Sequence, residues 1–223
     1  MSVIVSGCVS MEKNSENTVM GKTSKTIKSP TSEMPTHKQI LEALSDVRNY
    51  SFSELVLFPS INTTVFVRGA VAGKNASALV LSNTSLPSGV IKSRIVFFVS
   101  GNFYALLSKG KPILGCGNVS ETGDVFSFEV HPWGYILNFS KNQDFKVEKR
   151  DKEYVLRYHL PNLTIVLNSK FVPQRATLEL TLPSGGIVLK LRLFSVNKVY
   201  EVPVPEALRH FVPKVPSEVC GKR

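Results

Sequence analysis

The three cysteines carry the clearest chemical signals in the sequence, and Cys8 carries the first of them. It ends the tetrapeptide Val5-Ser6-Gly7-Cys8, which resembles a lipobox, the site at which a prolipoprotein is cut so that its cysteine becomes the lipidated N-terminus. A secretory signal has a basic n-region and an apolar run of roughly 7–15 residues, whereas seven residues precede Cys8 and none of them is Lys or Arg. We therefore expect a truncated signal peptide and a membrane anchor at Cys8, with the true start upstream. A chance tetrapeptide or a first strand is the alternative.

Lipidation of Cys8 would leave Cys116 and Cys220 as a pair that could form a disulfide. Such a bridge would close a loop of about 100 residues and contribute at most ~5 kcal/mol in the chain-entropy model. It would also hold the C-terminal tail to the folded domain. Two unpaired thiols are the alternative, because sequence alone does not give their separation.

Asparagines in Asn-x-Ser/Thr sequons are more numerous than the roughly two expected by chance. The sequon residues are Asn49, Asn62, Asn75, Asn83, Asn118, Asn138 and Asn162. Most fall at strand ends or turns, where a glycan would not disturb a core, but turn chemistry alone also favours Asn there. Lipobox, sequons and disulfide together place the chain outside the cytoplasm. We expect an archaeal-type, extracellular surface glycoprotein on the cell membrane, with glycosylation and plain turn chemistry both open.

No group of residues predicts catalysis. The four histidines, His37, His131, His159 and His210, are scattered, and His159 falls on the polar face of an expected strand. The sequence lacks the common zinc-protease, nucleophile-elbow, phosphate-loop and Cys-x-x-Cys motifs. We expect no enzyme, no cofactor and no metal site.

Residues 153–205 hold the strongest structural pattern, a two-residue alternation through two successive hairpins. Turns are expected at Pro161-Asn162 and at Pro183-Ser184-Gly185-Gly186. Such alternation predicts an antiparallel sheet that is apolar on one face and polar on the other. Because each Leu or Ile left in water forgoes roughly 1.5–3 kcal/mol, something must cover the apolar face.

The rest of the chain supplies further strands and a first helix. Thr36 and Gln39 form a capping box that starts a short helix ending near Asn49. Gly69 predicts a bulge or a sharp bend, and residues 131–137 read as a short helix or loop with the only Trp. A short helix is expected after residue 206. Strands are expected at 51–58, 63–72, 76–82, 94–100, 103–107, 112–115, 125–130 and, at an edge, 198–204.

Length and composition fit one folded domain, since 43% of the 223 residues are hydrophobic and 20% are charged. We expect a signal peptide and lipobox at 1–8, a disordered tether at 9–36, the domain at 37–211 and a tail at 212–223. The net charge of +10 is spread singly, which favours a solvated basic surface over attraction to an anionic membrane. Nucleic acid binding is the weakest interpretation, because no basic helix is present.

The layout resembles the LolA-like family. A short helix leads straight into a strand at 41–58, a long antiparallel meander follows with Val99-Ser100-Gly101-Asn102-Phe103-Tyr104 in its middle, and a closing segment ends in Val202-Pro203-Val204-Pro205. The family includes periplasmic lipoprotein carriers, LppX-type lipid-binding lipoproteins and RseB-type sensors. The resemblance covers about 37–205 and implies a mainly β (α+β) fold, a strongly curved, unclosed antiparallel sheet (a half-barrel) with helices on its concave face. Here the family's plug helices are reduced to about 131–137, and the chain is itself anchored.

The resemblance implies lipid binding between the sheet and its helical cover, with an acyl or isoprenoid lipid or a lipoprotein's anchor as the ligand. Trp133 and Tyr135 would lie at the mouth. The lining residues would be Leu163, Ile165, Leu167, Leu178, Leu180, Leu182, Ile187, Leu189 and Leu191. The same residues could instead pack as a solid core, and the chain would then be a surface glycoprotein or sensor lipoprotein that binds a protein partner.

Overall fold

The computed structural model describes residues 34–117, 131–140, 143–183, 185–214 and 220, in one compact unit that begins at Met34. The helices are α1 (His37–Ser45), η1 (Pro59–Ile61), α3 (Pro132–Ser140) and η2 (Glu206–Leu208). The first six strands are β1 (Asn49–Phe58), β2 (Thr63–Ala72), β3 (Asn75–Leu86), β4 (Gly89–Ser100), β5 (Phe103–Ser108) and β6 (Lys111–Cys116). The remaining strands are β7 (Phe145–Arg150), β8 (Glu153–Tyr158), β9 (Asn162–Asn168), β10 (Pro173–Leu182) and β11 (Gly185–Phe194).

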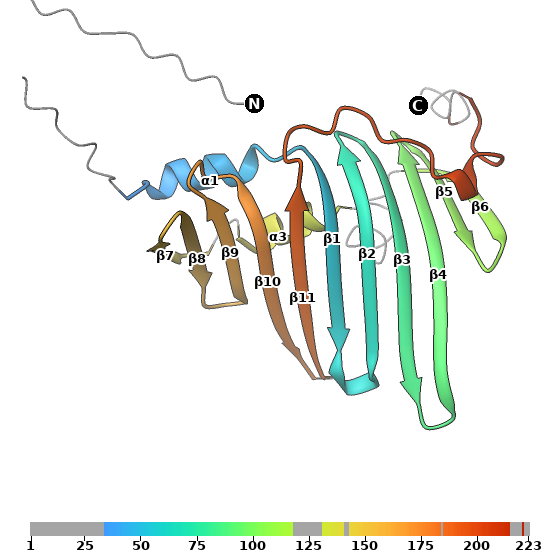
Figure 1. Cartoon of the computed structure of the whole chain (residues 1–223), viewed down its shortest axis with the longest axis horizontal. Coiled ribbons are helices and arrows are strands. Elements are labelled where there is room, and N and C mark those ends of the chain that lie inside the picture. Colours follow the sequence, from blue (N-terminus) through green and yellow to red (C-terminus); the bar gives the residue numbers. More distant parts are fainter. Residues whose placement is uncertain (1–33, 118–130, 141–142, 184, 215–219, 221–223) are drawn as a thin grey trace, which may run out of the picture. The chain divides into compact units, whose positions relative to one another are not determined.

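All eleven strands form one sheet in the order β6-β5-β4-β3-β2-β1-β11-β10-β9-β8-β7. Every neighbouring pair is antiparallel. The chain forms one meander from β1 to β6, crosses to the opposite edge, and returns as a second meander whose last strand, β11, pairs with β1 (Figure 1). The sheet is not closed into a barrel, so the predicted mainly β, unclosed antiparallel fold with little helix is confirmed.

The two faces of the sheet differ in what covers them. On the face that carries α1 and α3, which we call the inner face, the apolar side chains of nearly every strand join one buried cluster. The opposite, outer face has a smaller cluster near β4 and β5, where residues Val202 and Leu208 of the C-terminal segment pack. Alternation along each strand sends successive side chains to opposite faces, and this divides the residues between the clusters.

Helix α1 begins as the sequence predicts. The Thr36 side chain accepts a hydrogen bond from the Gln39 backbone N–H at 3.2 Å, and the Gln39 side chain accepts one from the Thr36 N–H at 2.9 Å. Ile40 and Leu44 are fully buried against the inner face. The helix is only nine residues long, so its stability comes from this packing rather than from helix propensity.

Hydrogen bonds join helix α3 to α1 and to β1. The indole N–H of Trp133 donates to the Leu44 carbonyl at 3.1 Å, and the Trp133 backbone N–H donates to the Tyr50 hydroxyl at 3.3 Å. Trp133 and Ile136 are both buried. The segment expected as a short helix or loop is therefore a helix that extends to Ser140.

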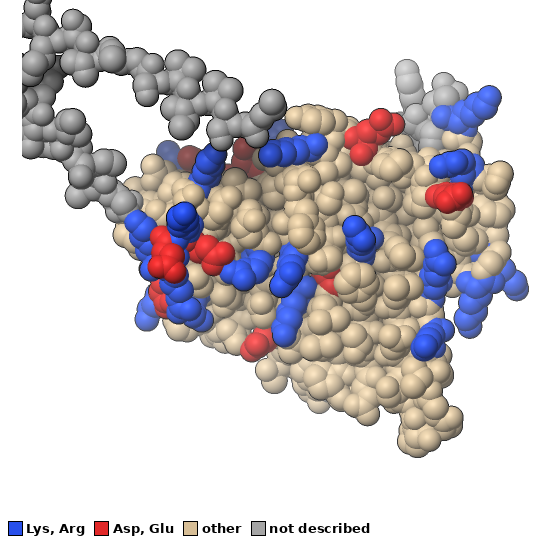
Figure 2. Space-filling view, viewed as in Figure 1, with Lys and Arg blue, Asp and Glu red and all other residues tan. Residues whose placement is uncertain are grey.

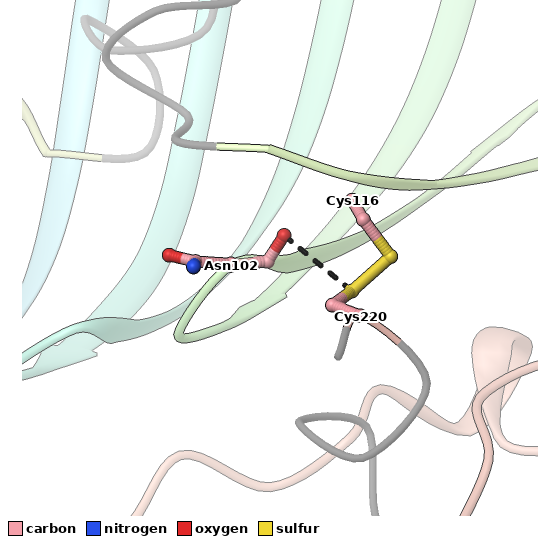
Figure 3. Close-up of a disulfide and its surroundings, with 3 residues drawn as sticks. All are labelled: Asn102, Cys116 and Cys220. Carbon is pink, nitrogen blue, oxygen red and sulfur yellow. Dashed lines mark hydrogen bonds between the residues drawn. A yellow bond between two sulfur atoms is a disulfide. The ribbon is translucent and has the colours of Figure 1, made fainter. Parts of the chain in front are cut away.

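The C-terminal segment returns along one end of the sheet and ends in a disulfide. Asn197 begins the return: its side chain accepts a hydrogen bond from the Arg48 N–H at 3.1 Å and donates one to the Asp46 carbonyl at 2.9 Å. The Cys116–Cys220 disulfide then joins the segment to β6, with the two Cα atoms 5.3 Å apart (Figure 3).

The sulfur of Cys220 lies 3.8 Å from the Asn102 carbonyl oxygen, in the turn between β4 and β5 (Figure 3). A disulfide sulfur has no proton to donate, so this is a packing contact rather than a hydrogen bond.

Three sequence-based expectations need correction or fall outside the described residues, and one strand was missed. The edge strand expected at 198–204 is irregular chain, because Pro203 and Pro205 cannot donate to a ladder. Strand β7 was not expected. The register runs unbroken through Gly69, opposite Phe52, so this glycine marks no bulge. The strand expected at 125–130 lies outside the described residues.

Candidate ligand site on the inner face

Cross-strand register brings the residues proposed from the sequence as lining onto one face. Leu178 lies opposite Leu163 on β9 and opposite Leu189 on β11. Ala176 is in the next row, between Ile165 and Leu191. Directly opposite residues of an antiparallel pair point to the same side with Cβ atoms about 5 Å apart, so these side chains form a continuous apolar surface.

The inner face is deeply covered at one end and accessible at the other. Along β10, Leu178 is 1% exposed, Leu180 is half-buried and Leu182 is 42% exposed. On β11, Leu189 is buried and Ile187, which lies opposite Leu180, is half-buried. The accessible part, which we call the open end, consists of Phe58, Val65, Leu180, Leu182 and Ile187.

The proposed lining therefore divides into two groups. Leu180, Leu182 and Ile187 belong to the open end. The residues buried in the cluster beneath the cover are Leu163, Ile165, Leu167, Leu178, Leu189 and Leu191. Register and alternation place both groups on one face, but only the first group is accessible to a ligand without movement of the cover.

The two aromatic residues proposed for the mouth differ in position. Trp133 is 1% exposed and hydrogen-bonded to Leu44, so it lies in the core and not at an opening. Tyr135 is half-buried, with its ring 4.9 Å from that of Phe139 in an edge-on arrangement. The aromatic side chains of α3 thus belong to the cover.

Glu54 is an inner-face residue that the sequence analysis missed. It is 1% exposed and is the one charged side chain among the buried described residues. The register places it at the centre of the sheet, between Val67 on β2 and Leu191 on β11. Its signal was present in the alternation of β1, which sends Tyr50, Glu54 and Val56 to the same side. Because burying a carboxylate is costly, Glu54 is an exception on this otherwise apolar part of the inner face.

Buried hydroxyl groups near the helices stay neutral. Burial raises the pKa of Tyr50 far above its ordinary value, and the nearby charge of Glu54 raises it further, while the hydrogen bond from the Trp133 N–H acts in the opposite direction. Burial likewise raises the pKa of Tyr158 to about 12, against a smaller opposing effect of Ser140. Both phenols are therefore protonated at physiological pH and add no charge to the inner face.

Two of the sequon asparagines accept hydrogen bonds from backbone N–H groups in turns. The Asn49 side chain accepts a hydrogen bond from the Gly73 N–H at 2.9 Å, and the Asn75 side chain accepts one from the Gly101 N–H at 3.2 Å. Asn162 donates to Glu179 at 2.7 Å. Of the remaining sequon residues, Asn62, Asn83 and Asn138 are exposed, and Asn118 lies outside the described residues. Local turn chemistry thus accounts for Asn49 and Asn75, whereas the Asn162 bond is a cross-strand side-chain pair between β9 and β10. Glycosylation stays a prediction.

The described residues do not test the proposed anchor. Within the described ranges no group of three or more His, Cys, Asp and Glu side chains could hold a metal ion. The described helices include none that is long and apolar enough to cross a membrane. Cys8, the proposed anchor, lies outside the described residues.

Comparison with known proteins gives a structural match alone. No family model and no curated protein matches the sequence. A solved structure, that of LprF from Mycobacterium bovis, is similar over 75% of this chain and 96% of that chain, with 11% sequence identity and a TM-score of 0.44. A likeness at this level does not assign the chain to a family.

Proposed function

We propose that the chain is a lipid-anchored, extracytoplasmic protein that binds a hydrophobic ligand at the open end of its inner face. The ligand would be an acyl or isoprenoid lipid or the lipid anchor of another lipoprotein. The observation that carries the proposal is the exposure gradient along a single apolar face, from 1% at Leu178 to 42% at Leu182. Soluble domains rarely leave a contiguous apolar surface in water without a partner for it.

An acyl chain is the simplest occupant of such a surface. It needs no hydrogen-bonding groups, and the open end offers only apolar side chains: Phe58, Val65, Leu180, Leu182 and Ile187. Burying about fourteen methylenes of a fatty acid is worth ~11 kcal/mol, of which roughly 4 kcal/mol or more is lost to association. The remainder corresponds to an affinity of the order of micromolar.

The proposal is tested by titrating a fluorescent fatty acid into the detergent-free chain. Micromolar binding is expected, and Leu182→Asp should abolish it by placing a charge at the open end. Phe194→Asp is the matched control, because Phe194 is similarly exposed, at 49%, on the outer face. Absence of binding by the folded parent chain, or equal loss in both variants, would refute the proposal.

The anchor is tested separately. Cys8→Ser should move the protein from the membrane fraction to the soluble fraction. Stable retention of the Cys8→Ser protein in bilayers, resistant to high salt, would show that lipidation at this residue is not the anchor.

A filled-core surface or sensor protein is the alternative. This alternative is supported by the nearly complete burial of the covered part of the inner face, where Leu163, Ile165 and Leu167 are inaccessible to solvent. Such a protein would bind a protein partner and no fatty acid, so the titration separates the two functions.

A further inference from the structure

The two ends of the sheet carry turns of different character. Because all neighbouring strands are antiparallel, successive turns alternate between the ends. We call one end the lower rim, as it is drawn in Figure 1, and it consists of the turns at 59–62, 87–88, 109–110, 159–161 and Pro183. The upper rim consists of the turns at 73–74, 101–102, 151–152 and 169–172.

Large exposed apolar side chains gather at the lower rim. Scattered single examples are ordinary on a protein surface, but here they recur in or beside four of the five turns. They are between 42% and 79% exposed and comprise Ile61, Leu86, Val90, Ile91, Leu160 and Leu182. The four turns of the upper rim contain no large exposed apolar residue, although Phe194, where β11 ends, and Tyr200 in the segment that follows are exposed.

The same end is strongly basic on the β2–β6 side. Residues 55–117 contain six Lys and Arg and no Asp or Glu. Four of the six, Lys92, Arg94, Lys109 and Lys111, lie on the lower part of β4 and around the β5–β6 turn. None of these four forms an ion pair with another described residue. Figure 2 shows only Lys and Arg among the charged side chains over the lower ends of β3 to β6.

A hollow of about 330 Å³ lies between β4, the β5–β6 turn and η2. Its walls include the cations Lys92, Arg94 and Lys109, together with apolar Val96 and Leu107. None of the described residues that line it is acidic. A basic hollow that also has apolar lining residues, on the strand that follows the exposed apolar β3–β4 turn, suits an anionic group attached to an apolar body.

We propose that the lower rim docks on the surface of an anionic lipid bilayer. Val90 and Ile91 at the β3–β4 turn enter the boundary between headgroups and acyl chains, while Lys92, Arg94 and Lys109 contact lipid phosphates. A bilayer fits better than a protein partner because the apolar side chains stand on separate turns and line no groove. A fluid surface accommodates such spacing without shape complementarity.

This docking goes beyond the proposed function and does not require it, nor does it require an anchor at Cys8. Leu182 belongs both to the lower rim and to the open end of the inner face. Docking would therefore hold the open end against the bilayer, where an apolar ligand could pass between the membrane and the inner face without crossing water.

Vesicle sedimentation of the full chain without attached lipid tests the docking. Phosphatidylcholine vesicles containing phosphatidylglycerol should bind the protein, phosphatidylcholine alone should not, and added salt should weaken binding. The combined change Lys92→Glu, Arg94→Glu and Lys109→Glu should weaken binding at least roughly a hundredfold, since each basic residue near an anionic surface contributes about fivefold and the three new carboxylates add repulsion.

An upper-rim variant provides the matched control. The combined change Lys74→Glu, Lys152→Glu and Lys170→Glu alters the net charge equally, and binding should fall by less than about fivefold, the contribution of a single near-surface cation. Fluorescence of the buried Trp133 reports folding in each variant, and glutamine replacements serve if a glutamate variant does not fold. Equal losses in the two variants would show that net charge alone drives binding and would overturn the proposal.

The apolar contribution is tested by changing Val90 and Ile91 to Ser, with Tyr200→Ser as a control away from the lower rim. Val90 and Ile91 are both exposed, so their replacement should leave the fold intact and weaken vesicle binding several-fold. Docking would be overturned if the Ser variant bound vesicles as well as the parent chain does. It would also be overturned if the parent chain formed a concentration-dependent dimer that the Ser variant does not form. Fatty-acid binding without vesicles should be unchanged in the charge variants, so failure of docking and failure of ligand binding are distinguishable.

Discussion

Replacing Leu178 and Leu182 separately by Ala tests whether the inner face is covered at one end and open at the other. The two residues lie on β10 and point to the same face, four positions apart. Their chemistry is identical, so any difference between the variants reports the environment.

The expected magnitudes follow from burial. Leu178 is 1% exposed, and a Leu→Ala change at such a site costs about 2–5 kcal/mol because a cavity remains. Leu182 is 42% exposed, so its replacement by Ala loses only about half of the transfer free energy and leaves no closed cavity. The expected loss in the free energy of unfolding is about 1 kcal/mol. The difference between the variants should therefore be at least about 1 kcal/mol.

Urea unfolding followed by tryptophan fluorescence measures both values, since Trp133 is the only tryptophan and is buried. The slope of free energy against urea should be the same in the parent and both variants. Equal destabilisation by the two substitutions would mean that the cover extends over Leu182, and the open end would not exist.

Three further predictions concern the rest of the fold. Replacing Cys116 and Cys220 by Ala opens a loop spanning 104 residues and should lower the free energy of unfolding by up to ~5 kcal/mol, measured in urea. Burial lowers the pKa of His131 below its ordinary 6.5. Below about pH 6.5 the unfolded chain therefore binds more protons than the folded chain. The free energy of unfolding should then decrease as the pH is lowered below that value. His131→Gln should flatten this fall in thermal melts at several pH values, whereas exposed His159→Gln should not. Gly69→Ala would push a methyl group into an aromatic ring of β1 and a backbone carbonyl of β3, and it should lower the thermal midpoint by an amount equivalent to roughly 1–3 kcal/mol.

Alternation located the strands wherever one face is buried. Strands β9, β10 and β11 follow the predicted pattern because their inward residues are Leu, Ile or Ala and their outward residues are mostly polar. Strand β7 was missed because Phe145 and Val147 are its only apolar residues, charged residues occupy its other positions, and both apolar residues are only half-buried at an edge. The alternation at Val202 and Val204 was misleading, since these residues pack onto the outer face as irregular chain.

The sequence predicts which face of the sheet carries the candidate site, but not how much of that face is covered. Alternation determines which way Leu178 and Leu182 point, yet nothing in it reports how far the cover extends along β10. The sequence analysis did not single out Glu54, although Phe52 and Val56 on either side share its inward register. The lower rim joins turns that are distant in sequence, and only the strand order brings them to one end.

Native mass spectrometry of the chain, first delipidated with organic solvent and then mixed with palmitate, tests the central claim most directly. We expect a mass increase of one palmitate for the parent chain and no such increase for Leu182→Asp. A folded parent chain that stays at its bare mass in the presence of excess palmitate would contradict a ligand site on the inner face.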